Sequence, residues 1–494
     1  MNFKNKSNFT TRLNSRLAIG AVALASAVMF SCSKVNEQQP YAKLDPKDAF
    51  SNPERIGKAA VGMYDALQNP EFLGGRVLLY ADQRGLDANI AGYFTNIGTF
   101  DMQSINNFAF NCWSGGYRTI NETNFFSINL KENEAVVGPT VAAGYYAEAK
   151  FIRALSYFYL VNTFAQTYAD QPTAAESGVP LILTAPRDGA EATDPKNKVK
   201  RNTVQEIYDQ MIKDLTEAAA VLPVKTGDAF ADHARATKGA AHALLSRIYL
   251  YQGNWAKARD FADSVLLSSN KYELDATPAA AFSAGNYQTS KERIFSVAMN
   301  SGDNPNTNNA LGQHYGSNGR ADVSISKLYR TLPNFDYQTD LRGKPLFSYN
   351  INKDNGDTIA FYTKKFFGTS TFDAWVPVIR LAEVMLIKAE ALARLNTGAP
   401  DAAAVKLLND IRARAKASVL APATQAELIT NILTERRIEL AFEGHGVTDF
   451  QRTKRDIPAH GNVVLQKWNG NYTIFPLPFA EVERNPNMKQ NEGY

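Results

Sequence analysis

Cysteine is almost missing from this chain. Of its 494 residues, only Cys32 and Cys112 carry a thiol. Two cysteines cannot build the disulfide framework of a small secreted domain, so the fold must be stabilised by a buried core. With 45% hydrophobic residues, a chain of this length can bury one large core, or two domains that share an interface.

An excess of charge of one sign is also missing. The chain has 53 basic and 49 acidic residues, and four of the basic ones lie before Cys32, which leaves 49 of each sign in the remainder. A nucleic-acid-binding protein needs a basic surface. The composition therefore indicates no nucleic-acid partner.

The usual catalytic signatures are absent as well. The five histidines include no pair at the spacing of a zinc protease. There is no Gly-x-Ser-x-Gly elbow and no phosphate-binding glycine loop. A pair of carboxylates that meets only in space cannot be recognised from sequence. The absence of these motifs favours a protein that is not an enzyme and that holds no cofactor or metal.

The N-terminus has the layout of an export signal. A basic leader without acidic residues precedes the apolar run of residues 17–30, which is shorter than the about 20 residues of a membrane-spanning helix. Residues 1–31 are therefore predicted to be a signal peptide. The run ends at FSCSK, which resembles a bacterial lipobox with Met29 in place of its usual leucine. We predict that Cys32 is lipidated; the alternative is an ordinary signal peptide with an incidental cysteine.

Helical periodicity dominates the rest of the chain. Residues 32–46 are polar and are predicted to be a tether. Beyond them, apolar residues recur every three or four positions and predict helices near residues 52–68, 142–168 and 203–223. Thr203 with Glu206 three residues later forms a capping-box pattern.

Two segments have the form of a helix–turn–helix. Gly253, Trp255 and Ala258 resemble the signature of tetratricopeptide helix pairs, in which glycine permits the turn and alanine permits close packing. Residues 380–395 and 401–417 form a second predicted pair. The expected fold is mainly α, with tetratricopeptide-like helix pairs, large loop-rich insertions and a few short strands or hairpins.

The middle of the chain differs in composition. Residues 270–375 are rich in Asn, Gly, Ser and aromatics, and they predict a strand at residues 293–300 and a hairpin around Asn355-Gly356. A calcium loop is the less favoured interpretation of NKDNGD, because its glycine is misplaced. We predict an N-terminal region at 47–235 and a C-terminal region at 236–494 that contains this insertion.

The stretch LTERRIELAFEGHGVTDFQRT, residues 433–453, crowds charges among apolar residues. On a helix its glutamates recur every four residues, so they can lie along one face. Charges that turn inward must be paired and hydrogen-bonded. One interpretation is an acid/base site containing Glu443 and His445. The favoured interpretation is a structural ion network that clamps helices together, formed by Arg380, Glu383, Arg436, Glu439 and Glu443.

Several stretches together resemble the SusD family of outer-membrane nutrient-binding lipoproteins. In the C-terminal half these are FDAWVPVIRLAEVMLIKAEALARL, ILTERRIELAFEGHGVTDFQRTKR and IFPLPFAEVERNPNMKQNEGY. In the N-terminal half they are CWSGGYRTINETNFF and AEAKFIRALSYFYLVNTFA. The motifs follow the family order and cover nearly the whole chain after Cys32.

The resemblance implies a non-catalytic binding protein. Members of this family are lipid-anchored at the outer membrane, facing the exterior, and form a lid over a SusC-like TonB-dependent transporter. They capture oligosaccharides, or in some cases peptides, and deliver them for import. Two alternatives remain open: a peptide-binding member of such a system, and a tetratricopeptide-type interaction scaffold without a small ligand.

Candidate ligand contacts lie in two irregular stretches, about residues 70–117 and 270–375. Sugars present apolar faces and hydroxyl rims, which aromatic rings and Asp, Asn or Arg side chains recognise. Trp113 and Tyr117 are set aside, because they fit a structural helix of the family. The candidates are Asp82, Arg84, Asn89, Tyr93 and Phe94 in the first stretch, Asn300, Asn309, His314, Tyr315 and Arg320 in the second, and Trp375 nearby.

Overall fold

The computed structural model describes residues 46–187, 189–194, 198–283, 289–306, 308–351 and 358–494. The predicted signal peptide, Cys32 and all but the last residue of the tether lie outside this part of the chain. The turn at Asn355-Gly356, with the alternative calcium loop, lies outside it too. Within the described ranges, every helix is too short or too polar to cross a membrane.

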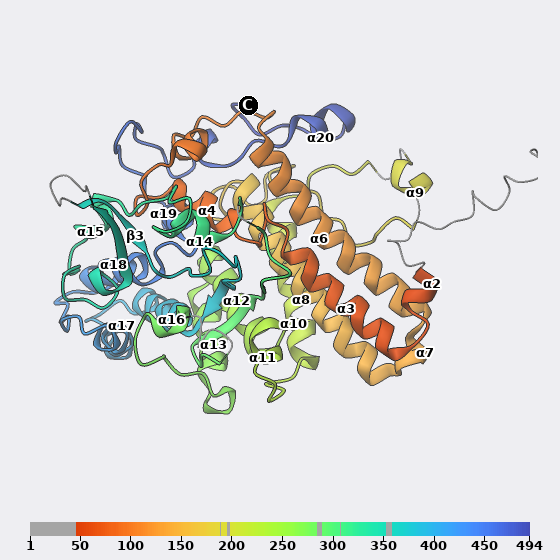
Figure 1. Cartoon of the computed structure of the whole chain (residues 1–494), viewed down its shortest axis with the longest axis horizontal. Helices are drawn as coiled ribbons and strands as arrows, with labels where there is room; N and C mark the ends of the chain where they lie inside the picture. The colour runs from red at the N-terminus through yellow and green to blue at the C-terminus, as the bar shows by residue number, and fades with distance from the viewer. Residues whose placement is uncertain (1–45, 188, 195–197, 284–288, 307, 352–357) are drawn as a thin grey trace, which may run out of the picture.

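A row of long helices forms one side of the molecule (Figure 1). Consecutive helices of the row pack on each other through the apolar stripes that the sequence predicts; on the first helix Ile56, Ala60 and Met63 are buried. The predicted capping box is confirmed, since Thr203 and Glu206 bond each other's backbone N–H groups. The helices of the row are α3 (Pro53–Leu67), α6 (Asn107–Glu132), α8 (Pro139–Phe164) and α10 (Val204–Val221).

Helix pairs continue the fold toward the C-terminus. Gly253 has a φ of 72° and turns the chain between the first two helices, while Ala258 is fully buried where they pack. Both predicted helix pairs are thus confirmed, and so is the mainly α fold class. The helices are α12 (Lys238–Gln252), α13 (Trp255–Leu266), α16 (Leu381–Leu395), α17 (Ala402–Arg414) and α18 (Gln425–Leu440).

The strands form two short antiparallel pairs. β1 (Arg293–Val297) pairs with β4 (Val376–Arg380), and β2 (Phe347–Ile351) pairs with β3 (Thr358–Thr363). The predicted strand and the predicted hairpin pairing are confirmed. β4 was not predicted, because all five of its residues are buried and it shows no alternation of polar and apolar residues.

One main hydrophobic core joins the two predicted regions. It extends in sequence from Phe50 to Met488 and includes residues on both sides of position 235. Short helices lie around it: α2 (Pro46–Ala49), α4 (Arg76–Gln83), η1 (Gly92–Phe94), α5 (Thr95–Gly98), α7 (Glu134–Val137), α9 (Gly189–Thr193), α11 (Ala231–Ala234), α14 (Leu311–Tyr315), α15 (Lys327–Arg330), α19 (Gly446–Arg452) and α20 (Phe479–Arg484).

Candidate functional site

The charged motif of residues 433–453 lies largely in the interior. α18 ends before Glu443, so the expectation that Glu443 continues the helix is wrong. Two residues with left-handed backbone, Phe442 (φ 68°) and Gly444 (φ 83°), turn the chain there. A Cβ on Gly444 would lie 2.9 Å from the Cα of Leu78, so this turn packs directly against α4.

The turn directs Glu443 into a cluster of buried charges. Arg380 places Nε 2.7 Å from Glu443 Oε2 and Nη1 2.6 Å from Glu439 Oε1. Lys365 Nζ lies 2.7 Å from the other oxygen of Glu443. Burial alone would raise the pKa of Glu443, but the two cations lower it to about 2. Both of its oxygens are therefore occupied, and it has no proton to donate at neutral pH.

Two other members of the proposed ion network have partners outside it. Glu383 accepts from Arg247, with 2.7 Å between Oε1 and Nε. Arg436, which helical spacing could place beside Glu439, instead pairs with Asp449 at 3.1 Å. Burial lowers the pKa of His445 to about 4, which keeps this imidazole neutral at pH 7.

The two irregular stretches meet in space although they are 235 residues apart. The backbone N–H of Asn89 donates to the carbonyl of Ser324 at 2.8 Å. The side-chain amide of Asn89 donates to the Ser324 hydroxyl at 2.9 Å. An isolated β-bridge joins the adjacent residues Ala88 and Ile325. The two stretches are therefore in direct contact at this point.

Tyr93 is the exposed centre of this part, with 51% of its surface accessible. Its ring packs edge-on against Phe94 and Phe108, with centroids 4.9 Å and 5.4 Å away. The guanidinium carbons of Arg320 and Arg76 lie 5.3 Å and 5.5 Å from the centre of the Tyr93 ring. These contacts hold the ring in one orientation while half of it stays open to solvent.

Polar groups surround Tyr93. Arg320 donates from Nε to Asp322 Oδ2 at 2.8 Å and from Nη1 to Asn308 Oδ1 at 3.0 Å. His314 Nδ1 lies 2.8 Å from the same oxygen of Asp322. Burial alone would raise the pKa of Asp322, but the bonds from His314 and Arg320 lower it. We call the surface formed by Tyr93, Asn308, Arg320 and Asp322 the Tyr93 face.

Asn308 and Asp322 were missed by the sequence reasoning. Asn308 is next to the candidate Asn309, and Asp322 is two residues beyond the candidate Arg320. Asp322 could have been found, because a carboxylate two residues from an arginine in a polar stretch can pair with it. No local pattern tells which of two adjacent asparagines faces the arginine.

Six of the candidate side chains are buried and offer almost no accessible surface to a ligand. Asp82, for example, accepts from the Tyr315 hydroxyl at 2.8 Å and from the backbone of Gly444, and burial raises its pKa to about 8. Trp375 donates from its ring nitrogen to the carbonyl of Met299 at 2.9 Å. Burial argues against direct contact for the following six: Asp82, Arg84, Phe94, His314, Tyr315 and Trp375.

The remaining candidates are accessible but not equivalent. Tyr93 and Arg320 lie together, whereas the amide of Asn89 is bonded to Ser324. Asn309 is half-buried and bonds the carbonyl of Pro305 at 3.2 Å. Asn300 is exposed, with its side chain capping the turn that follows it. The Tyr93 face is thus where the structure concentrates the predicted binding chemistry.

Two family models match most of the chain. The model described as "SusD family" matches residues 270–494, and the model described as "Starch-binding associating with outer membrane" matches residues 37–250. The chain belongs to the SusD family. The second description associates the matched family with starch binding and with the outer membrane.

Individual relatives agree with this assignment. The chain is 26% identical over 524 residues to SusD-like protein P2 of Formosa agariphila, covering 94% of this chain and 97% of that protein. It is 31% identical over 137 residues to the starch-binding protein SusD of Bacteroides thetaiotaomicron, covering 25% of this chain and 22% of that one. A crystal structure of a SusD superfamily protein from Bacteroides fragilis matches with a TM-score of 0.77 at 27% identity, over 90% of this chain and 100% of that one. The predicted family is confirmed.

Proposed function

We propose that this protein is a lipid-anchored, outer-membrane binding protein that captures oligosaccharides and passes them to a SusC-like TonB-dependent transporter. The observation that carries the proposal is the Tyr93 face, where a fixed, half-exposed ring lies beside an arginine, a carboxylate and an amide. Family membership supports the ligand class, because one matching model is described as starch-binding.

The Tyr93 face has the chemistry that a sugar requires. The apolar face of a pyranose ring packs on the Tyr93 ring, and its hydroxyls bond the polar groups around it. Arg320 is held by Asp322 and Asn308, so its position is set before the ligand arrives. Such preorganisation lowers the entropy that is lost when the ligand binds.

A role without catalysis is supported by the charged motif. Glu443, its candidate general acid or base, is buried and bonded to Arg380 and Lys365. A general acid or base must reach the substrate and exchange a proton near the working pH. We therefore assign the motif to the scaffold and expect no product when the protein is incubated with a glycan.

Export and anchoring are proposed from the leader sequence. The basic start, the short apolar run and Cys32 support an exported lipoprotein. The orientation toward the cell exterior is proposed from the family resemblance alone. We expect palmitate labelling of the wild-type protein in cells and its loss in Cys32→Ser. Co-purification of a large TonB-dependent barrel with the wild-type protein is the corresponding test of the transporter partner.

Binding is tested by calorimetry against a panel of plant, host and microbial polysaccharides. We expect at least one glycan to bind, and Tyr93→Ala to weaken that binding about tenfold, equivalent to about 1.4 kcal/mol. Tyr93→Phe keeps the ring and should retain most of the affinity. Phe230→Ala is the matched control, because Phe230 is also about half exposed, at 50%, but lies outside the Tyr93 face. Binding of peptides with no binding of any glycan would refute the oligosaccharide assignment.

A further inference from the structure

A second exposed ring lies on the ribbon formed by β2 and β3, at the left of Figure 1. Tyr349 of β2 is 40% exposed and stands opposite Phe361 of β3. Paired residues of antiparallel strands point to the same face, and the centroids of these two rings lie 6.0 Å apart. The Phe361 ring also contacts Phe347, at 6.2 Å, and Tyr337, at 6.5 Å. One face of the ribbon is therefore an aromatic surface that extends from the core to solvent.

Arg330, the last residue of α15, lies over this aromatic surface. Its guanidinium carbon is 4.3 Å from the centre of the Phe361 ring and 5.8 Å from that of Tyr337. Its Nε is buried there without a hydrogen-bond partner, whereas its two terminal nitrogens are accessible and bond no residue that the structure describes. The rings thus fix the guanidinium while its terminal N–H groups stay open to solvent. We call Arg330, Tyr337, Tyr349 and Phe361 the Tyr349 platform.

The charge of Arg330 is not balanced by a carboxylate within the described ranges. Two acidic residues follow it closely in the sequence, but both are engaged elsewhere. Asp336 accepts from the Thr339 hydroxyl at 2.7 Å. Asp340 is buried and pairs with Arg342 at 2.7 Å. The platform therefore carries a positive charge that an incoming ligand can meet.

The arginine of the Tyr93 face differs in this respect. Arg320 pairs with Asp322 at 2.8 Å, so this pair brings no net charge to the sugar that lies on Tyr93. Arg330 has no such partner in the part of the chain that the structure describes. Its free N–H groups form their strongest hydrogen bonds with an anion. The two surfaces share a ring and an arginine, and they differ in the charge of the ligand that they suit.

The platform adjoins the junction of the two irregular stretches. The backbone N–H of Ile325 donates to the carbonyl of Phe361 at 2.7 Å. Ile325 is also the residue that forms the β-bridge with Ala88. The ribbon is thus joined, through one intervening segment, to the stretch that carries Tyr93.

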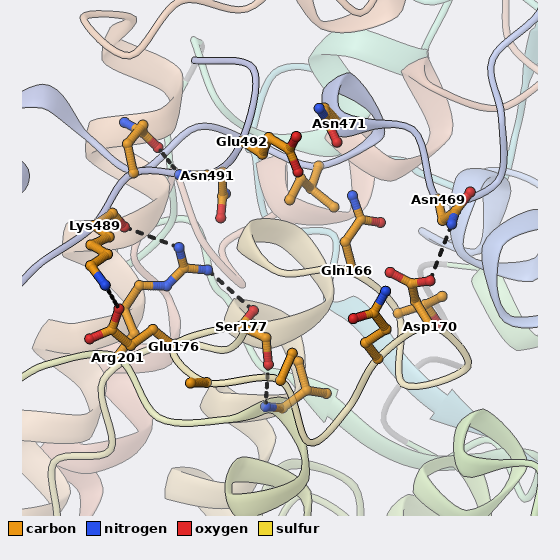
Figure 2. Close-up of a pocket in the computed structure, with 17 residues that line it drawn as sticks. Gln166, Asp170, Glu176, Ser177, Arg201, Asn469, Asn471, Lys489, Asn491 and Glu492 are labelled. Atoms are coloured by element: carbon orange, nitrogen blue, oxygen red, sulfur yellow. Dashed lines mark hydrogen bonds and ion pairs between the residues drawn. The ribbon is translucent and has the colours of Figure 1, made fainter.

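The hollow drawn in Figure 2 lacks this combination of a ring and a free charge. It has a volume of about 400 Å³ and lies between the segment that follows α8 and the C-terminal segment. None of its 17 described lining residues is aromatic, and its Gln490 and Asn491 amides donate to backbone carbonyls. Its described lining therefore offers a sugar no stacking surface.

We propose that the Tyr349 platform is a second glycan contact, which selects a sugar unit that carries a carboxylate or a sulfate. The Tyr349 ring takes the apolar face of the sugar, and Arg330 donates to its anionic oxygens. Phe361 contacts both side chains, which places the Tyr349 ring and the guanidinium one ring apart. The inference rests on the proposed function for its general ligand class, but it adds the acidic character of the ligand and concerns a different surface.

Matched polysaccharides isolate the charge of the ligand. Polygalacturonate is compared with its methyl ester, and carrageenan, a sulfated galactan, with its desulfated form. Calorimetry at low salt should show at least one acidic polymer bound about tenfold more tightly than its neutral counterpart. The acidic polymer that binds more tightly identifies the anionic group. The preference should shrink as salt is added, because Arg330 is only partly buried and its charge is screened.

Two variants test the platform independently. Arg330→Gln should abolish the preference for the acidic form and leave the affinity for the neutral form unchanged. Tyr349→Ala should weaken binding of the acidic polymer about tenfold, with a melting temperature within a few degrees of the wild type because Tyr349 is exposed. It keeps the test valid if Arg330→Gln lowers stability by removing contacts with Phe361. Arg118→Gln is the charge-matched control, because Arg118 is an exposed arginine on α6, outside the platform.

The outcomes separate this inference from the proposed function. If glycans bind without preference for the acidic forms, or if the preference survives in Arg330→Gln, the acidic contact is refuted and the Tyr93 face stands. If Arg118→Gln reduces the preference as much as Arg330→Gln does, the effect belongs to overall charge and the contact is refuted. If Tyr93→Ala abolishes binding of the acidic polymer and Tyr349→Ala leaves it unchanged, the Tyr93 face alone binds glycan and the contact is refuted. If no glycan binds, both proposals fail.

Discussion

The charged motif and the Tyr93 face are built from the same kinds of residue but differ in burial. Each combines arginine with carboxylates beside aromatic rings. Glu443 of the motif and its partner Arg380 are 6% and 2% exposed, and both are fully engaged with each other and with neighbours. At the Tyr93 face, Tyr93 is half exposed and Arg320 is accessible. Burial, more than residue type, separates the structural clamp from the proposed binding surface.

Burial also sets how much each ion pair contributes. Breaking a buried pair leaves an uncompensated charge in a medium of low dielectric, whereas an exposed pair is screened by water. Arg380 holds three carboxylates, those of Glu292, Glu439 and Glu443. Arg320 holds one, that of Asp322. Substitutions at the buried pairs of the motif should therefore lower the free energy of unfolding. Substitutions at the Tyr93 face should instead lower the affinity for glycan.

The largest effect is expected for Arg380→Ala. Three buried carboxylates lose a shared cation, and the free energy of unfolding should fall by about 3–5 kcal/mol. Denaturant titration measures this loss. Arg320→Ala is the matched control and should change stability by less than about 1 kcal/mol. If the two substitutions lowered the free energy of unfolding equally, the distinction between a structural cluster and an exposed face would be wrong.

Two neighbouring rings provide the next comparison. Phe94 is fully buried, so Phe94→Ala should cost about 3 kcal/mol or more of stability through the cavity that it leaves. Tyr93→Ala, one residue earlier, should cost about 1 kcal/mol or less and act mainly on glycan affinity. Thermal unfolding and calorimetry on both variants measure the two quantities. A Phe94→Ala protein of normal stability that fails to bind glycan would make Phe94 a direct contact.

Acid should weaken the motif selectively. The folded pKa of Glu443 is about 2, below its ordinary value of 4.5, because Arg380 and Lys365 outweigh the opposing effect of burial. Its contribution is therefore present above pH 4.5 and is lost as the pH falls from 4.5 toward 2, by about 3 kcal/mol in all. Glu443→Gln should flatten this part of the stability profile. Glu54→Gln, at an exposed pair with Lys58 that water screens, should change the profile far less.

Much of the fold could be predicted because its signals are local. The apolar stripe of α3, the capping box at Thr203 and the left-handed Gly253 each depend on residues within a turn or two of the chain. The end of α18 was missed for the opposite reason. Phe442 adopts a positive φ, which is rare for phenylalanine and which the local sequence does not predict. The turn packs against α4, which is far away in the sequence.

The site was harder to predict than the fold. Aromatic and polar residues singled out two irregular stretches, which the structure brings into contact, and Tyr93 and Arg320 lie side by side there. Which of two adjacent rings faces solvent is decided by packing against residues more than 200 positions away, such as His314 beside Phe94. Sequence periodicity carries no such information where there is no helix or strand.

The smallest change in stability, and the sharpest test of the Tyr93 face, is expected for Asp322→Asn. The amide keeps the shape of the carboxylate but removes the charge that holds Arg320 at 2.8 Å. Because Arg320 is exposed, the free energy of unfolding should change by less than about 1 kcal/mol. Glycan affinity should fall about threefold or more, since Arg320 must then be ordered by the ligand itself. An unchanged affinity, measured by calorimetry on a protein of normal melting temperature, would show that Arg320 needs no anchoring and would reduce the site to the Tyr93 ring.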